Sequence, residues 1–253
     1  MTDRRVNVVP AGVIAVVRAA TAGECRAIVR GLILAGVPAI ELTLTVPDAV
    51  ALIREFAAEL AGAGPSPGAR PDAGPDAGPG PGPGPGPDAG PGPGPGKGTV
   101  LGAGTVLDAA QCAAVAEAGA TFIVSPVTDA AVLSESRRHG AGYVGGALTP
   151  TEVLASMRAG ADAVKLFPVG SVGGASYLRA LREPLPELRA VVSGGISAGE
   201  APGYFAAGAH AVCLGGALID RDAARRGDVP AVAAKARLVL GQIAAGVSER
   251  ACE

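Results

Sequence analysis

Lys165 stands where a lysine could act as a nucleophile. It interrupts a short apolar run, Ala163-Val164-Lys165-Leu166-Phe167, which ends at Pro168 and is typical of a buried strand. The other lysines, Lys97 and Lys235, lie in a Gly/Pro tract and in an Ala-rich helical stretch, where we expect them to be solvated. A lysine in an apolar pocket loses hydration, which favours the neutral amine, and a neutral amine attacks carbonyl carbon. On these residues alone, an ordinary ion pair at a strand end is the alternative.

Other polar residues and glycines follow similar short runs. Arg18 ends the first run, and the second carries Glu41 and Thr43. Further runs lead into Gly102-Ala103-Gly104-Thr105, Ser125-Pro126, Ser193-Gly194-Gly195-Ile196-Ser197 and Gly215-Gly216-Ala217. Each signal is weak alone, because a Gly-Gly pair is usually a tight turn and Glu41 could be a structural partner of Lys165. If the strands are parallel, however, these residues meet at one edge of the sheet, where glycine-rich loops commonly hold phosphate through backbone N–H groups and a helix dipole.

Short β-branched runs alternate with Ala-rich stretches of helical spacing. The predicted strands are Val13–Val17, Ala39–Thr43, Thr99–Ala103, Thr121–Val124, Gly142–Gly145, Ala161–Leu166, Arg189–Ser193 and Ala211–Leu214. Predicted helices between them include Ala22–Ala35, Asp48–Leu60, Asp108–Ala118 and Thr151–Ala159. Strands that alternate with helices imply βαβ units and a parallel sheet, and eight such units predict a single α/β fold, the (β/α)8 TIM barrel. A doubly wound open sheet is the main alternative.

Helix ends are well marked. A Thr or Ser precedes a Glu by three residues at Thr21/Glu24, Thr149/Glu152 and Ser197/Glu200, which predicts a capping box at each helix start. Several helices run out into an Ala-Gly pair, and the glycines expected to cap them are Gly36, Gly119, Gly160 and Gly208.

Residues 61–98 differ from the rest of the chain. They consist almost wholly of Gly, Pro, Ala and Asp, and 12 of the 22 prolines lie between Pro65 and Pro95. The tract has no apolar side chains that would offset the entropy of ordering it, so we predict a disordered insertion between the second helix and the third strand. The 1–253 chain is then one barrel domain interrupted by this insertion. Without the tract, roughly 215 residues remain, near the lower end for one barrel.

Composition excludes several function classes. The net charge of −2 gives no general attraction to nucleic acid or to an anionic membrane. No uninterrupted apolar run reaches the ~18 residues of a membrane span, and the first apolar segment is too short for a signal peptide. The four cysteines show neither close pairs nor metal-ligand spacing. We therefore expect a cytoplasmic protein with reduced thiols, no metal and no cofactor.

A set of motifs runs in register over nearly the whole chain outside the tract. They are Val13–Arg18, Ile40–Thr45 with Pro47, Gly102–Val106, Phe122–Pro126, Thr149–Glu152, Val164–Pro168 and Ser193–Ser197. In combination they resemble the 2-dehydro-3-deoxy-6-phosphogluconate (KDPG)/4-hydroxy-2-oxoglutarate (KHG) aldolase family of class I, Schiff-base aldolases. The resemblance implies a small-molecule 2-oxo acid as substrate.

The resemblance also implies roles for individual residues. Lys165 would form an imine with the C2 ketone of the substrate, and Glu41 would be the general acid/base. Arg18 and Thr105 would hold the pyruvoyl carboxylate. The other implied substrate contacts are the pocket walls Pro126 and Phe167 and the phosphate-binding backbone of Gly194, Gly195, Gly215 and Gly216.

The chain departs from the family pattern at three places. Thr45 stands where some relatives have an arginine, so the carboxylate role rests more heavily on Arg18. Gly145 begins a loop in which the family usually has a proline before the glycine. Ala217 replaces a serine hydroxyl that some members place near the phosphate. Substrate identity therefore stays open between KDPG, its phosphogalactonate epimer and unphosphorylated KHG.

Other side chains have simpler interpretations. His139 is expected to cap a helix C-terminus, and His210 to precede the last strand on the side away from the site. Cys213 is interpreted as a small core residue. Arg221, Arg225 and Arg226 are interpreted as a solvated face rather than a binding patch.

Two other function classes are weighed against the aldolase. A phosphate-binding barrel enzyme without a covalent intermediate would need a second acid or a metal site at the mouth. A non-catalytic sugar-phosphate binding protein would not need both Lys165 and Glu41. The family resemblance further implies a homotrimer.

Overall fold

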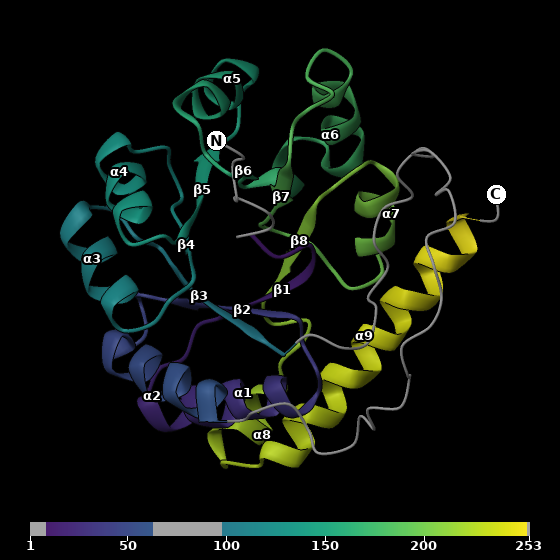
Figure 1. Ribbon diagram of the computed structural model, residues 1–253. Coiled ribbons are helices and arrows are strands. Elements are labelled where there is room, and N and C mark those ends of the chain that lie inside the picture. The colour runs from purple at the N-terminus through teal and green to yellow at the C-terminus, as the bar shows by residue number, and fades with distance from the viewer. Residues whose placement is uncertain (1–8, 63–97, 252–253) are drawn as a thin grey trace, which may run out of the picture.

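In the computed structural model, which describes residues 9–62 and 98–251, eight parallel strands close into a barrel (Figure 1). The strands are β1 (Gly12–Val17), β2 (Ala39–Thr43), β3 (Val100–Gly104), β4 (Phe122–Val124), β5 (Gly142–Ala147), β6 (Ala163–Leu166), β7 (Ala190–Val192) and β8 (Ala211–Leu214). Each strand pairs with the next in sequence, and β8 closes onto β1 with Leu214 opposite Ala15. The predicted TIM barrel is confirmed, and the doubly wound alternative is wrong.

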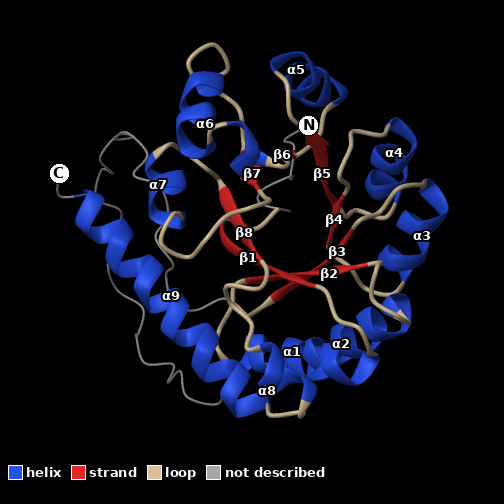
Figure 2. Cartoon of the chain, turned by 180° about the vertical axis from the view of Figure 1, so that it is seen from behind, coloured by secondary structure: helices blue, strands red, loops and turns tan. Residues whose placement is uncertain are grey.

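Helices surround the barrel on all sides (Figure 2). They are α1 (Ala22–Leu34), α2 (Ala49–Gly62), α3 (Ala109–Glu117), α4 (Ala130–Arg138), α5 (Pro150–Ala159), α6 (Gly174–Arg182), α7 (Ala201–Ala206), α8 (Arg221–Arg225) and α9 (Val229–Ala251), with a 3-10 segment η1 (Val169–Val172) before α6. Boundaries differ from the predicted ones by at most two residues, for example at β6, which begins at Ala163 rather than Ala161. Asp162 explains it, because its carboxylate accepts a hydrogen bond from the Tyr143 N–H instead of joining a strand face.

The helix caps mostly follow the sequence pattern. Thr149 and Glu152 form a complete capping box, whereas the Glu24 carboxylate accepts the N–H of Ala20 rather than that of the cap residue Thr21. The capping box predicted at Ser197 is wrong: its N–H and hydroxyl both donate to Glu200, and α7 starts only after that turn, at Ala201. The four predicted terminal glycines all have positive φ, which glycine adopts without steric cost.

Alternation along the strands sorts side chains into two cores. Val164 and Leu166 of β6 point outward into the large core between barrel and helices. Ala163 belongs to a smaller cluster inside the barrel, together with Cys213. Because side chains alternate with a period of two, Lys165 shares the interior face with Ala163, and Glu41 shares it with Ala39.

Glycines in the strands leave room for neighbouring side chains and backbone. A Cβ added to Gly102 would overlap the Phe122 ring, and one added to Gly146 would overlap the backbone of Pro126. Phe122 is completely buried and fills the space that Gly102 leaves. Gly102 thus makes room for Phe122, the aromatic member of the cluster inside the barrel.

The last helix is unusually apolar. α9 is long and apolar enough over Val229–Arg250, by length and composition, to cross a membrane, so the search for uninterrupted apolar runs missed it. It also carries Lys235 and packs along α1 and α7 on the outside of the barrel, as Figure 1 shows. Val232, Ala236 and Val239 form the buried side of that contact. We interpret α9 as a wall helix of the barrel.

The Gly/Pro tract falls between α2 and β3, as predicted. Its first two residues, Ala61 and Gly62, belong to α2, so the helix runs two residues further than predicted. The predicted disorder of the tract lies outside the described residues, and for those residues the assignment of 1–253 to one domain stays a prediction. The described ends of the tract are Gly62 and Gly98, where α2 stops and β3 is about to begin. That is the face opposite the carboxyl ends of the strands.

Deleting residues 64–96 should therefore leave kcat nearly unchanged, because active sites of such barrels lie at the carboxyl ends of the strands. The measurement is steady-state cleavage of a 2-oxo acid by the deletion variant and by a variant with a Gly/Ser segment of equal length. A large fall in kcat in the deletion variant alone would show that the tract contributes to the site.

Candidate active site

A buried amine and a buried carboxylate face each other inside the barrel. Lys165 Nζ of β6 lies 3.8 Å from Glu41 Oε1 of β2, and the two residues are 5% and 0% exposed. Register places both near the carboxyl ends of their strands, with Lys165 opposite Gly146 and Glu41 opposite Gly102. Burying either charge alone would be costly, so each depends on the other.

The Glu41 carboxylate is positioned by packing contacts rather than by hydrogen bonds. Neither of its oxygens accepts a hydrogen bond from another described residue. A Cβ on Gly104 would overlap Oε1, so the glycine backbone forms the floor against which this carboxylate rests. Thr105, the next residue, has φ of 61°, a left-handed conformation that is strained for a β-branched residue. Unsatisfied buried groups and local strain of this kind are typical of functional sites.

Two neighbours connect the ion pair to an adjacent cavity. The Phe167 ring centroid lies 5.4 Å from Lys165 Nζ, so one face of the amine meets an aromatic surface. Cys213 of β8 is close enough to Glu41 and Lys165 to feel both charges. The pKa of the Cys213 thiol is raised to about 12, mainly by burial and also by the charge of Glu41, while Lys165 opposes the effect. Cys213 is thus a neutral thiol beside the pair.

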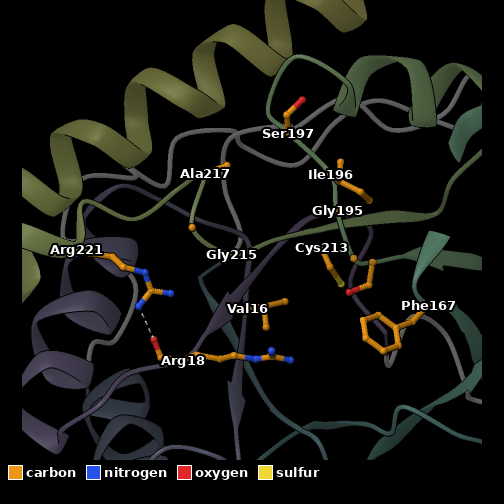
Figure 3. Close-up of a pocket in the computed structure, with 13 residues that line it drawn as sticks. Val16, Arg18, Phe167, Gly195, Ile196, Ser197, Cys213, Gly215, Ala217 and Arg221 are labelled. Carbon is orange, nitrogen blue, oxygen red and sulfur yellow. Dashed lines mark hydrogen bonds between the residues drawn. The ribbon is translucent and has the colours of Figure 1, made fainter. Parts of the chain in front are cut away.

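The cavity has a volume of about 470 Å³ and opens between the loops after β1, β6, β7 and β8 (Figure 3). It contains six of the residues predicted for the site: Arg18, Phe167, Gly194, Gly195, Gly215 and Gly216. Lys165 and Glu41 do not line it directly. They lie near it, because the Phe167 ring lies over Nζ and the Cys213 thiol is within range of both charges, and both of these residues line the cavity.

Thr105 and Pro126 lie outside this cavity. Thr105 follows β3 on the Glu41 side of the barrel. Pro126 follows β4, and its backbone packs against Gly146, the residue opposite Lys165. Thr45, where some relatives have an arginine, has its hydroxyl 2.7 Å from that of Thr43, which donates to the Val17 carbonyl. Arg18 therefore lines the cavity, whereas Thr105 lies next to Gly104, against which the Glu41 carboxylate rests.

The glycine loops offer backbone donors rather than helix termini. Gly194 and Gly195 have φ of 92° and 74°, conformations that side chains rarely adopt. The helices after these loops are short, α7 with six residues and α8 with five. Within the described part of the chain, the N–H groups of Gly195, Gly216 and Ala217 donate no hydrogen bond. Exposed N–H groups of this kind form an anion-binding surface without a long helix dipole.

Arg221 is the functional candidate that the sequence interpretation missed. It lines the cavity, and its Nη1 donates to the Arg18 carbonyl at 3.3 Å. The prediction of a solvated face agrees with the exposure of Arg221, Arg225 and Arg226, and Arg225 pairs with Asp222 at 2.9 Å on that surface. It missed that Arg221, whose side chain is 44% exposed, also lines the cavity. The available signal was its place only five residues after Gly216, at the start of α8.

The remaining candidates lie away from the cavity. His139 is the C-cap residue of α4, with Nε2 3.0 Å from Glu135 Oε1. His210 precedes β8, and burial lowers its pKa; its Nε2 lies 3.1 Å from the Val9 carbonyl. Cys25 and Cys112 are free and buried, as is Cys213 beside the cavity, and Cys252 lies outside the described residues. No group of His, Cys, Asp or Glu able to hold a metal occurs among the described residues.

Gly104→Ala should lower kcat by about 100-fold or more, because the added methyl group must displace the Glu41 carboxylate from its place beside Lys165. The measurement is kcat together with the thermal unfolding midpoint, which reports folding. Gly98→Ala is the matched control, since an added Cβ there meets nothing within 4 Å. Unchanged kcat in folded Gly104→Ala would mean that the position of Glu41 does not matter for turnover.

The chain is similar to known aldolases in both sequence and fold. A probable 2-dehydro-3-deoxy-6-phosphogalactonate aldolase of Rhizobium meliloti (strain 1021) is 32% identical over 206 residues, covering 81% of this chain and 80% of that protein. The KHG/KDPG aldolase of Escherichia coli (strain K12) is 34% identical over 139 residues, 54% of this chain and 65% of that protein.

A solved structure agrees with these relatives on the fold. The KDPG aldolase of Legionella pneumophila superposes with a TM-score of 0.70 at 19% identity, covering 92% of this chain and 95% of that one. The family model described as KDPG and KHG aldolase matches residues 96–235, more than half of the chain. With this match and a relative aligned over four fifths of its length, the chain belongs to the KDPG and KHG aldolase family.

Proposed function

We propose that this protein is a class I aldolase that cleaves KDPG to pyruvate and glyceraldehyde 3-phosphate, KHG to pyruvate and glyoxylate, or both. The observation that carries the proposal is the buried Lys165 amine, 3.8 Å from a Glu41 carboxylate that accepts no hydrogen bond from another described residue. An imine-forming lysine beside a carboxylate is the arrangement that this chemistry needs.

The first step needs a neutral amine. Transfer of one proton from Lys165 to Glu41 leaves two neutral groups in a buried site, which removes the cost of burying two charges. At 3.8 Å the atoms are too far apart for a direct hydrogen bond, so the proton would pass through a water or after a small shift. The amine then attacks the C2 ketone, and Glu41 returns its proton to the carbinolamine hydroxyl, which leaves as water to give a protonated imine and restores the Glu41 carboxylate.

Cleavage follows from the electron demand of that imine. Glu41 takes the proton of the C4 hydroxyl, the C3–C4 bond breaks, and its electron pair moves to the imine nitrogen. The aldehyde leaves, and an enamine of pyruvate stays on Lys165. Protonation of C3 by Glu41 and addition of water release pyruvate and restore the amine.

Substrate contacts follow from position. Arg18 supplies a positive charge and, with Thr105, is proposed to hold the pyruvoyl carboxylate of the substrate. Pro126 and Phe167 are proposed to form the pocket walls around the Lys165 amine. The Phe167 ring already lies over Lys165 Nζ. The distal phosphate is assigned to the loop backbones of Gly194, Gly195, Gly215 and Gly216, which line the cavity.

The phosphogalactonate epimer is the second candidate substrate. The Rhizobium meliloti relative, aligned over 81% of this chain, is named for that activity. Both epimers release the same products, so initial rates with each purified epimer distinguish them. A barrel enzyme without a Schiff base would need a second acid or a metal site at the mouth; the cavity lining contains no carboxylate, and the described residues form no group able to hold a metal. A non-catalytic binding protein would not need both Lys165 and Glu41. We further propose that the protein is a homotrimer in the cytoplasm. Light scattering of the purified protein tests the oligomeric state.

Borohydride reduction in the presence of pyruvate should fix a pyruvate adduct on Lys165, because hydride reduces the imine to a stable amine. Peptide mass mapping locates the adduct. Lys165→Ala should lose it, and Lys235→Ala, which removes an exposed lysine of α9, should keep it. The absence of an adduct on the folded wild-type protein would overturn the Schiff-base proposal.

Glu41→Gln should lower kcat by about 100- to 10,000-fold, since the amide cannot shuttle protons at C4 and C3. The adduct on Lys165 should still form, although more slowly. Steady-state cleavage and the trapping yield are measured on the same preparation. A kcat close to that of the wild type would remove Glu41 from the proton transfers.

A further inference from the structure

We propose that Arg221 binds the distal phosphate of the substrate and makes the enzyme selective for phosphorylated over unphosphorylated 2-oxo acids. The proposal rests on the aldolase function above and adds a side chain to a site so far described only by backbone groups. Arg221 would also supply a side-chain donor that is missing at Ala217, where some relatives have a serine hydroxyl.

Position is the first argument. Arg221 lines the same cavity as the glycine loops after β7 and β8. In Figure 3 its guanidinium lies on the side of Gly215 and Ala217, whereas the Arg18 side chain extends past Val16 toward Phe167. The two arginines therefore serve different ends of the cavity: Arg18 faces the end beside the reacting amine, and Arg221 faces the distal end.

The second argument is the way in which Arg221 is held. Its Nη1 donates to the Arg18 carbonyl at 3.3 Å and lies 3.8 Å from Glu24 Oε1. The other oxygen of Glu24 accepts the Ala20 N–H, so this carboxylate is fixed in turn. A guanidinium has five N–H donors, and within the described residues the Nη2 and Nε groups of Arg221 make no hydrogen bond. The side chain is anchored on one side and has free donors on the other.

Charge is the third argument. The ionisable side chains that line the cavity are Arg18, Arg221 and the neutral Cys213 thiol, with no carboxylate among them. Glu24 balances part of the charge of Arg221 from behind, at 3.8 Å. The Ser197 hydroxyl is already donated to Glu200, so it is not a free donor for an anion. A phosphate at this end would find backbone N–H groups and one cation, which is Arg221.

Geometry favours phosphate over a single point charge. The planar fork of an arginine donates two parallel hydrogen bonds to phosphate oxygens. A cavity of about 470 Å³ lies in the range of small-molecule sites, so a phosphorylated four- or five-atom chain can be accommodated beyond the amine. An unphosphorylated substrate such as KHG would leave this end empty, and loss of Arg221 should then matter little.

The first experiment measures binding of inorganic phosphate by isothermal titration calorimetry to the wild-type protein, Arg221→Gln, Arg221→Lys and Arg225→Gln. Arg225→Gln is the matched control, because it removes the same charge from the same helix at an exposed pair with Asp222. We expect Arg221→Gln to weaken phosphate binding about 10- to 100-fold, Arg221→Lys to weaken it less, and Arg225→Gln to change it less than twofold. Equal binding to Arg221→Gln and to the wild type, or no phosphate binding by the wild type, would overturn the proposal.

The second experiment compares kcat/KM for KDPG and KHG in the same variants. Arg221→Gln should lose about 10- to 100-fold with KDPG and less than twofold with KHG. Equal losses with both substrates would mean that Arg221 has only a structural role. Borohydride trapping of pyruvate needs no phosphate, so an adduct in Arg221→Gln keeps this result separate from the test of the Schiff-base mechanism.

Discussion

The structure depends on one interaction, the pairing of Lys165 with Glu41 in a place almost without water. A carboxylate that is 0% exposed and an amine that is 5% exposed are tolerated inside a barrel only because they lie 3.8 Å apart. Their strands are four positions apart around the barrel, so the pair forms only once the sheet has closed. The pair then lies where the carboxyl ends of the strands meet, which is the part of this fold that carries chemistry.

Small residues around the pair make room for a substrate. Gly104 lets the carboxylate rest on backbone, Gly146 of β5 lets the loop after β4 approach it closely, and Gly102 leaves room for the Phe122 ring. The chain contains only 3% aromatic residues and places few of them at the mouth. Phe167 is the exception at the amine, where a ring surface 5.4 Å from Nζ excludes water on one side. The interior is therefore packed at the bottom and left open toward the cavity.

The distal end of the cavity presents backbone N–H groups and an arginine instead of a buried ion pair. Its loops present backbone N–H groups without a long helix behind them, since α7 and α8 are short. Arg221 adds the charge, and it is positioned by the Arg18 carbonyl and by Glu24 of α1. Residues from β1, α1 and α8 thus meet at one point because β8 closes onto β1. In the proposed arrangement, Arg18 serves the reacting end of the cavity and Arg221 serves the distal end.

Local signals in the sequence were sufficient for the barrel and for most of the residues that the structure brings to the cavity or to the buried pair. Strand and helix runs follow from short-range periodicity, the αβ glycines from their backbone conformation, and the buried position of Lys165 from its apolar neighbours. Local signals failed at Ser197, where the carboxylate of Glu200 stabilises a turn instead of capping the next helix. They failed again at Arg221, because three arginines within six residues look alike in sequence. Only the closed barrel decides that one of them faces the cavity and another pairs with Asp222 in solvent. The sequence by itself determined which chemical groups are present and on which elements they lie. The distance between Lys165 and Glu41, and the choice of Arg221, depend on contacts between residues far apart in the chain, which the tertiary structure alone creates.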